Sequence, residues 1–367
     1  MQVRDKMAPR SQTIGRPFRI CLGNRLSNRI GLGGVALLLV LCLCPDFGRA
    51  DEKRHVVIVE TMTLPFLQST TAWVRKGLLS LGYKDSEDIE FTVLNAEGKP
   101  DRAKQLLSDT LAAEKIDLVV TIATLASRAT RQVLKGKDLP QVFAIVADPV
   151  GEGFVSAIGE KSGSNITGST HVVPSEVKLR VVAQSIANLA ISRPFRMGLL
   201  RSSYPSAISD ARYLFAQVGK FKEIEFSELA FDYAPGEAGR TEMREAARSL
   251  VKANADRLDG LWLAVGPNQL DLQFIETVLT LKVPIIYAEG ATAGKAGVML
   301  GLRSSPEING RAVAALIDAV FRNTPVEDIP ITRPESFAVG INITTAKRIG
   351  AIIPSHILEL AGENIYR

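Results

Sequence analysis

The segment from Asp117 to Ser169 restricts the possible folds of this chain more than any other part of the sequence. Two apolar runs in it, Leu118 to Ile122 and Gln141 to Val146, have the length and composition of buried strands, and small or polar residues follow each run. In parallel sheets, the connections beyond the carboxyl ends of the strands bring polar side chains and helix N-termini to one crevice. We therefore predict a parallel α/β sheet whose ligand-binding edge lies in this segment.

The first fifty residues have the features of an export signal. The leader contains eight Lys and Arg residues, seven of them before the apolar run Val35 to Cys44, and Gly48 to Ala50 offers small residues that fit a signal peptidase site. We predict a signal peptide over residues 1–50 and a mature protein in the periplasm. A single transmembrane anchor is the alternative, but the apolar run is shorter than the ~20 residues that a span needs.

Charge and cysteine content separate this leader from the rest of the chain. The formal net charge is +5, but residues 51–367 contain 36 Lys and Arg against 37 Asp and Glu, so the mature protein is nearly neutral and a nucleic-acid partner is not expected. Cys21, Cys42 and Cys44 all lie in the leader, which leaves the mature protein without a disulfide, a thiol nucleophile or a Cys metal ligand. A lipid anchor is disfavoured because a leucine precedes both Cys42 and Cys44.

After the leader, strand-like and helix-like segments alternate with short turns, which is typical of parallel α/β architecture. The first strand is expected at His55 to Glu60, a polar turn at Thr61 to Gln68 and the first helix at Ser69 to Leu81. The alternation begins again after the helix from Pro174 to Ala190. The pattern predicts two Rossmann-like lobes of similar size in a single monomeric chain.

These lobes are expected to be joined by a hinge of several strands, as in a Venus-flytrap clamp. Hinge segments are predicted at His171 to Ser175 and near Gly294 to Gly297. The predicted N-terminal lobe comprises residues 51–170 and 297–324, and the predicted C-terminal lobe comprises residues 171–296 and 325–367.

The sequence offers no recognisable catalytic set. His55 opens a strand and His356 lies in the last helix, so only His171, at the expected crossing, is placed to meet a ligand, although a lone histidine there is often structural. No nucleophile elbow, zinc-protease helix, P-loop or dinucleotide-binding glycine motif follows a strand. Carboxylates at strand ends, such as Asp148 and Glu289, serve ligand recognition as readily as acid–base chemistry. We predict a protein that is not an enzyme, needs no metal or cofactor, and closes around a small-molecule ligand.

Several short motifs resemble those of the ABC-transporter substrate-binding family, which includes tryptophan- and phenylalanine-binding periplasmic proteins. The likeness runs from about Val56 to the C-terminus. It implies a type I periplasmic binding fold and delivery of the ligand to an ABC permease in the inner membrane with its cytoplasmic ATPase. The motifs are NAEG at Asn95 to Gly98, AT-LAS at Ala123 to Ser127, VADPVGEGFV at Val146 to Val155, NITGST at Asn165 to Thr170 and INITTAKRIGAIIP at Ile341 to Pro354.

The resemblance implies ligand-binding residues in the first lobe. Thr124 matches the threonine of a G-T-P-A turn, where a helix N-terminus can receive a ligand carboxylate, but Leu125 replaces the proline. Asp148 matches the aspartate of a T-D-P-V-G motif and either pairs with a ligand ammonium or caps the local backbone. Thr167 and Ser169 are hydroxyl donors to a ligand or members of a turn. The candidate ligand-binding residues of this lobe are Phe66, Thr124, Leu125, Ser127, Asp148, Thr167 and Ser169.

The second lobe departs further from the family motifs. Val265 to Pro267 stands where the family often has Thr-Asp-Asn, and Glu289 lies in a turn where many members have an acidic turn with a serine. These departures leave the ligand less constrained than the fold. Phe66 and Tyr204 are placed either to stack on an aromatic or apolar ligand or to pack within the protein. The candidate ligand-binding residues of this lobe are Ser203, Tyr204, Asn268 and Glu289.

Two functions remain open at this point. The leading interpretation is a periplasmic solute-binding component of an ABC importer, with an amino acid or a related carboxylate as the candidate ligand. The alternative is a sensory protein that uses the same clamp to present ligand occupancy to a membrane receptor or histidine kinase. The altered turns of the second lobe keep this alternative open.

Overall fold

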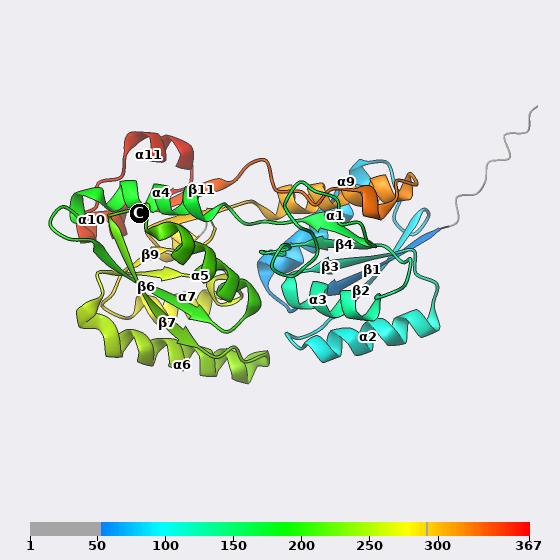
Figure 1. Ribbon diagram of the computed structural model, residues 1–367, viewed down its shortest axis with the longest axis horizontal. Coiled ribbons are helices and arrows are strands. Elements are labelled where there is room, and N and C mark those ends of the chain that lie inside the picture. Colours follow the sequence, from blue (N-terminus) through cyan, green and yellow to red (C-terminus); the bar gives the residue numbers. More distant parts are fainter. Residues whose placement is uncertain (1–52, 291–292) are drawn as a thin grey trace, which may run out of the picture. The chain divides into compact units, whose positions relative to one another are not determined.

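A computed structural model describes residues 53–290 and 293–367, so the predicted signal peptide lies outside the described residues. Within these ranges the strands form a five-stranded sheet in the order β2-β1-β3-β4-β5 and a seven-stranded sheet in the order β12-β11-β10-β9-β8-β6-β7 (Figure 1). The prediction of two α/β lobes is confirmed. The described helices include none with both the length and the apolar character that a membrane span requires.

The first sheet is parallel throughout and is covered on both faces. In β1, Val56 and Ile58 join the core beneath α1 and α9, whereas Val57 and Val59 pack with residues of α2 and α3. Burial on both faces explains the unbroken apolar run that the sequence shows here. The elements are β1 (Arg54–Glu60), α1 (Pro65–Ser80), β2 (Ile89–Asn95), α2 (Pro100–Ala113), β3 (Leu118–Ile122), α3 (Thr124–Val133), β4 (Gln141–Ala144), β5 (Ile166–Ser169) and α9 (Pro306–Phe321).

Two local expectations differ from the structure. Helix α1 begins at Pro65 rather than at Ser69, because a proline at the first helical position loses no hydrogen bond and is already in the helical conformation. The NITGST motif contains the edge strand β5 in place of the expected turn, with Ile166 and Gly168 paired to β4.

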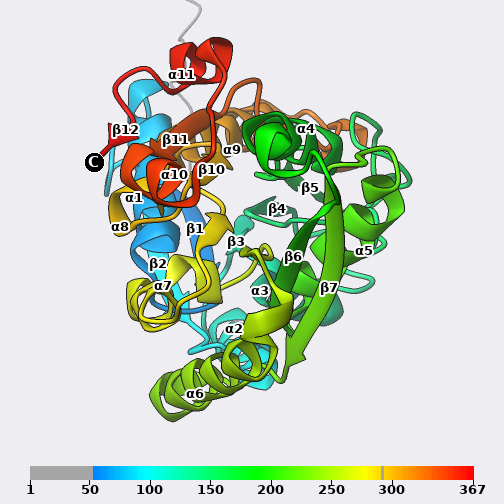
Figure 2. The same cartoon turned by 90° about the vertical axis from the view of Figure 1, so that its left-hand side faces the viewer.

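The second sheet is parallel from β7 to β10, and β11 joins it antiparallel to β10. Helices α4 and α5 share a core with one face of this sheet, and α6 and α7 pack on the other face (Figure 2). The remaining elements are α4 (Ser175–Ile186), β6 (Phe195–Ser202), α5 (Pro205–Val218), β7 (Ile224–Phe231), α6 (Gly236–Asn254), β8 (Gly260–Leu263), η3 (Asn268–Leu270), α7 (Leu272–Leu279), β9 (Ile285–Tyr287), α8 (Ala293–Ala296), β10 (Leu300–Arg303), η4 (Val326–Asp328), β11 (Ala338–Asn342), α10 (Ile343–Ile349), α11 (Ser355–Ala361) and β12 (Ile365–Tyr366), with short 3-10 turns η1 (Ala187–Leu189) and η2 (Ala255–Arg257).

The chain passes between the two sheets after β5, after β10 and again before β11. The predicted boundary at residue 297 is therefore wrong, because β10 pairs with β9 and β11 in the second sheet and the crossing follows at 304–305. Gly297 resembles a hinge in the sequence, yet its carbonyl accepts a hydrogen bond from the Thr345 hydroxyl within the second lobe. The boundary at 325 also moves, since Thr332 still bridges to Ser169 of the first sheet.

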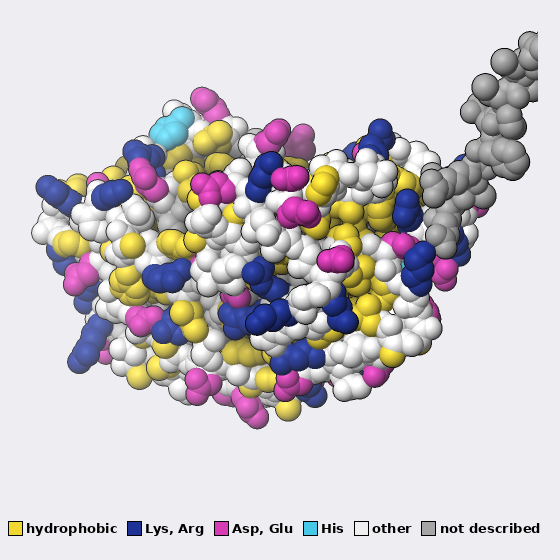
Figure 3. All heavy atoms as spheres, turned by 45° about the vertical axis from the view of Figure 1, so that its right-hand side comes forward, with side chains coloured by type: hydrophobic (Ala, Val, Ile, Leu, Met, Phe, Trp, Pro, Cys, Tyr) yellow, Lys and Arg dark blue, Asp and Glu magenta, His cyan; other side chains and the backbone are white. Residues whose placement is uncertain are grey.

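The face drawn in Figure 3 shows Lys and Arg side chains interspersed with Asp, Glu and apolar side chains. This mixture agrees with the nearly neutral balance of charges in residues 51–367.

Candidate functional site

A cavity of about 30 Å³ lies where the carboxyl ends of the two sheets face each other, and we refer to it as the interlobe cavity. Open parallel sheets bind ligands at this edge. The first lobe contributes mainly apolar side chains to its wall, and the second lobe contributes most of the polar ones. It is lined by Met62, Leu64, Phe66, Leu67, Ala123 and Ile145 from the first lobe, by His171 from the crossing, and by Tyr204, Val265, Gly266, Pro267, Gln269, Leu270, Glu289 and Arg303 from the second.

A larger opening of about 730 Å³, the side groove, shares part of its wall with the interlobe cavity. Its additional walls come from the first turns of α1 and α9 and from α7 and α8. The shared residues are Phe66, Gln269, Leu270, Glu289 and Arg303.

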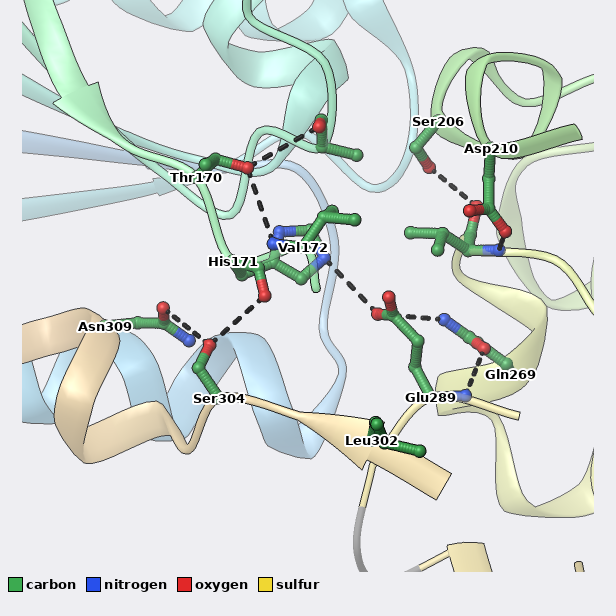
Figure 4. A network of polar contacts seen from close by, with 12 residues as sticks. Thr170, His171, Val172, Ser206, Asp210, Gln269, Glu289, Leu302, Ser304 and Asn309 are labelled. Carbon is green, nitrogen blue, oxygen red and sulfur yellow. Dashed lines mark hydrogen bonds and ion pairs between the residues drawn. The ribbon is translucent and has the colours of Figure 1, made fainter. Parts of the chain in front are cut away.

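Glu289, just beyond β9, is the most buried carboxylate in this wall, with 2% of the residue exposed. Its backbone N–H donates to Gln269 Oε1 at 2.7 Å, and Gln269 Nε2 donates to Glu289 Oε2 at 3.4 Å. His171 Nε2 lies 3.6 Å from the same carboxylate oxygen, and a dashed line marks this contact in Figure 4. The other oxygen, Oε1, has no hydrogen-bond partner among the described residues, although Lys178 Nζ lies 3.9 Å away.

Lys178 of α4 and Asp210 of α5 form a fully buried ion pair behind Glu289, with Nζ and Oδ1 2.5 Å apart. The second oxygen of Asp210 accepts a hydrogen bond from the Val265 backbone N–H at 3.0 Å. The two charges cancel each other, so this pair braces the strand ends of the second lobe and leaves Glu289 and Arg303 to set the charge of the cavity wall.

Arg303 ends β10 and lies flat on Phe66 of the first lobe, with its guanidinium carbon 3.6 Å from the ring centroid. Cation–π contact of this kind holds a guanidinium in place while leaving its N–H groups free. Its buried Nη1 finds no hydrogen-bond acceptor in the part of the chain that the structure describes. The wall thus holds one unused cationic donor, on Arg303, and one unused carboxylate acceptor, on Glu289.

Burial controls the protonation of the ionisable groups in this wall. It raises the pKa of Glu289 to about 7, with Lys178 and Arg303 opposing the shift. It lowers the pKa of His171 to about 3, helped by the positive charges of Arg303 and Lys178, so His171 is neutral. Burial also lowers the pKa of Arg303 to about 10, which still leaves the guanidinium charged at neutral pH.

Asp148, a predicted ligand residue, instead joins the two lobes. Its carboxylate accepts hydrogen bonds from Arg212 Nη2 at 2.7 Å and from the Tyr213 hydroxyl at 2.9 Å, both on α5 of the second lobe. It also accepts the Gly151 backbone N–H at 2.7 Å. Its oxygens are committed to these contacts, and it does not line the interlobe cavity.

The N-terminus of α3, where the sequence predicted a ligand carboxylate, faces Tyr204 of the second lobe. The Tyr204 hydroxyl interacts with the Leu125 backbone N–H and the Thr61 side chain, and burial raises the pKa of this phenol. Thr124 is itself buried, and its neighbour Ala123 is the residue that lines the cavity. Phe66, Tyr204 and Glu289 are thus the sequence-predicted residues that the structure brings together.

The remaining predicted hydroxyls are engaged within the protein. Ser127 pairs with the Thr121 hydroxyl at 2.8 Å, and Thr167 donates to the Ile329 carbonyl at 3.0 Å. Ser169 donates to the Thr170 carbonyl at 3.3 Å, and the Ser203 hydroxyl accepts the Tyr233 N–H at 2.8 Å. None of these four residues lines the interlobe cavity.

Asn268 lies at a third opening of about 220 Å³, between the turn after β1 and helix α6. Its amide nitrogen lies 3.4 Å from the Met243 sulfur, and its buried oxygen is unpaired within the described residues. Asn268 therefore flanks the interlobe cavity and does not line it.

Sequence reasoning missed Arg303 and Gln269. Arg303 is the last residue of the apolar strand β10 and has a strand-end position like that predicted for Asp148, but residues 297–324 were expected in the first lobe. Gln269 directly follows the candidate residue Asn268, and no sequence pattern distinguished it. Among the residues that the structure covers, no cluster of three or more His, Cys, Asp or Glu side chains could hold a metal ion.

The chain is similar in sequence to known proteins. Residues 55–191 match a family model described as ABC transporter substrate binding protein. A tyrosine-binding protein from Clostridioides difficile (strain R20291) is 24% identical over 308 residues, which cover 82% of this chain and 82% of that relative.

Crystal structures share the fold. An ABC domain from Streptococcus pneumoniae in complex with L-Trp has a TM-score of 0.72 at 21% identity, over 86% of this chain and 100% of that chain. The ligand-free, open structure of a substrate binding protein with adhesive properties from Clostridium difficile has a TM-score of 0.59 at 19% identity, over 85% of this chain and 98% of that chain. The family-model match and the shared fold together confirm the resemblance of this chain to the ABC transporter substrate-binding protein family.

Proposed function

We propose that this protein is the periplasmic solute-binding component of an ABC importer. It holds a small organic ligand between its lobes and delivers it to an inner-membrane permease and its ATPase. The observation that supports this role is the pair of unused charged groups, Arg303 and Glu289, in a wall formed by the strand ends of both lobes. Polar groups that converge in a largely apolar pocket are typical of ligand recognition.

The ligand that fits these groups is an amino acid or a related carboxylate. The Arg303 guanidinium presents free donors to a carboxylate, and the Glu289 carboxylate presents a free acceptor to an ammonium group. The apolar wall of the first lobe, which includes Phe66 and Leu64, suits a hydrophobic side chain. The names of the tyrosine-binding relative and of the L-Trp complex support an amino acid ligand.

Ligand entry requires the lobes to separate or the ligand to extend into the side groove. The interlobe cavity of about 30 Å³ is close to the volume that one water molecule occupies in the liquid. The lobes touch through Asp148 and Arg212 and through the Tyr233 hydroxyl, which donates to the Gly98 carbonyl at 3.3 Å. A hinge motion that breaks these contacts would open the cavity.

Thermal-shift screening of the mature protein against the L-amino acids and their deaminated analogues tests this function. A ligand at 100 times its dissociation constant stabilises the folded state by about 2.7 kcal/mol. Arg303→Gln should weaken binding of a carboxylate ligand by about 10- to 100-fold, because a hydrogen bond to a charged group contributes about 1.5–3 kcal/mol. Arg311→Gln, which removes an exposed arginine on α9, is the matched control and should bind normally. No stabilisation by any member of the screen would refute an amino acid ligand.

A further inference from the structure

The charge of the interlobe cavity depends on one side chain. The buried pair of Lys178 and Asp210 is neutral, and burial keeps His171 uncharged. Arg303 then supplies one positive charge, which Glu289 balances only when it is ionised. The wall therefore complements a zwitterion when Glu289 is ionised and an anion when Glu289 is protonated.

We propose that Glu289 carries a proton in the empty cavity and releases it when a ligand ammonium group binds beside its unpaired oxygen. This inference rests on the proposed function, and it makes Glu289 the residue that selects the ligand by charge. Ligand binding is then coupled to a proton exchange. The proton is released when the ligand has an amino group and taken up when the ligand has none.

The surroundings of Glu289 favour the protonated form when no ligand is present. Gln269 binds one carboxylate oxygen and the neutral His171 approaches the same oxygen at 3.6 Å, while the buried Oε1 has no hydrogen-bond partner in the described chain. A buried carboxylate is costly unless its oxygens are fully hydrogen-bonded, and protonation removes the buried charge that causes most of this cost.

The charged and titratable groups around Glu289 come from α4, α5, β9, β10 and the crossing after β5. Arg303 and Lys178 favour its ionised form, and Asp210 opposes it. Tyr287 and His171 are neutral neighbours, because burial raises the pKa of the tyrosine and lowers that of the histidine. The effect of burial on the pKa of Glu289 is larger than the opposing effect of the two cations. The resulting pKa is about 7, so a single added ammonium group shifts Glu289 toward its ionised form at neutral pH.

The expected proton exchange has a definite sign. An ammonium group stabilises ionised Glu289, so a bound amino acid lowers the pKa of Glu289 and expels its proton. About half a proton should be released per ligand at pH 7 if Glu289 is half protonated there. A deaminated analogue brings only negative charge, so it should bind with proton uptake, and its affinity should fall as the pH rises.

Infrared spectroscopy of the ligand-free protein tests whether Glu289 is protonated in the empty cavity. The wild type should show a protonated carboxyl C=O band that disappears between about pH 6 and pH 8. Glu289→Gln should lack this band. Glu276→Gln, which removes an exposed carboxylate from the side groove, should retain it. The absence of a titrating band, or its persistence in Glu289→Gln, would overturn the inference.

The ammonium ion tests, without any amino acid ligand, whether an ammonium group causes Glu289 to release its proton. It is close to water in size, so it matches the interlobe cavity. Ammonium chloride should shift the midpoint of the band to lower pH in the wild type, whereas tetramethylammonium chloride at the same concentration should not. Equal midpoints in the two salts would overturn the inference.

Calorimetry with L-tyrosine and L-tryptophan in two buffers of different ionisation enthalpy then measures protons released on binding. Release that is lost in Glu289→Gln supports the inference, and proton-neutral binding refutes it. If neither amino acid binds while the band responds to ammonium, the proposed ligand fails and the charge selection by Glu289 stands.

Discussion

Asp148 accepts hydrogen bonds from Arg212 and Tyr213 of the other lobe. We predict that these bonds stabilise the arrangement in which the lobes touch, even when no ligand is bound. Arg212→Ala removes one charge-assisted hydrogen bond across the lobe boundary, whose Nη2 to Oδ2 distance is 2.7 Å. Arg212 is 59% exposed, so solvent screening reduces its contribution to about 1 kcal/mol. Asp148 keeps its bond to Gly151 within the first lobe, which limits the penalty of leaving it unpaired.

This magnitude converts to a measurable shift between the closed and open arrangements. A loss of about 1 kcal/mol raises the open-to-closed ratio by about fivefold. The double variant Arg212→Ala with Tyr213→Phe removes both contacts of Asp148 across the boundary. It should cost about 2 kcal/mol, or about 30-fold.

Residues 51–367 contain no cysteine, so spin labels can be placed without a competing thiol. Cysteines at the exposed positions Ser108 on α2 and Lys252 on α6 would report the distance between the lobes by double electron–electron resonance. The variants should populate longer distances than the wild type in the absence of ligand. Arg180→Ala, which breaks an exposed ion pair inside α4, should not. Unchanged distance distributions in the double variant would show that this contact does not hold the lobes together.

Three further predictions concern groups around the cavity. Lys178→Met should destabilise the fold by about 3–5 kcal/mol in denaturant titrations, because it leaves the buried charge of Asp210 uncompensated, and an effect below about 1 kcal/mol would argue against a structural pair. The folded-state pKa of His171, about 3, lies below its unfolded value of about 6.5, so its contribution to stability should fall as the pH drops from about 6.5 toward 3. His171→Asn should flatten that dependence, and parallel pH profiles would contradict burial as the cause. Tyr204→Phe should cost about 1–2 kcal/mol in thermal unfolding, since it leaves the buried Leu125 N–H without its partner.

The fold was predictable from the sequence because strands that are buried on both faces of a sheet appear as continuous apolar runs. The apolar runs of β1, β3 and β4 appear with nearly their observed bounds. The lobe boundaries were less accessible, because a glycine such as Gly297 permits a hinge and a turn within a lobe equally well. Only the pairing of β10 with β9 and β11 shows that Gly297 lies within the second lobe, and the pairing with β11 joins residues far apart in the chain.

The candidate site was predictable only in part. Tyr204 and Glu289 each lie two residues beyond a strand, and Phe66 lies in the first turn of the helix that follows β1, and all three line the interlobe cavity. Asp148 also follows a strand, but β4 ends at Ala144 and the backbone turns at Ile145, which has a φ of 61°. This turn separates Asp148 from the cavity and brings it to Arg212, a partner that no local pattern reveals.

The two lobes contribute different kinds of side chain to the cavity, and for this reason the altered turns of the second lobe have the larger effect on ligand choice. The cavity residues of the first lobe are apolar, whereas Gln269, Glu289 and Arg303 of the second lobe carry the polar contacts. A ligand with a charged head would therefore engage the second lobe first, while water still fills the cleft. Closure then brings Phe66 and its apolar neighbours over the bound head, excludes water and strengthens each charged interaction. On this order of events the second lobe determines which ligand is accepted, and the first lobe determines how tightly it is held.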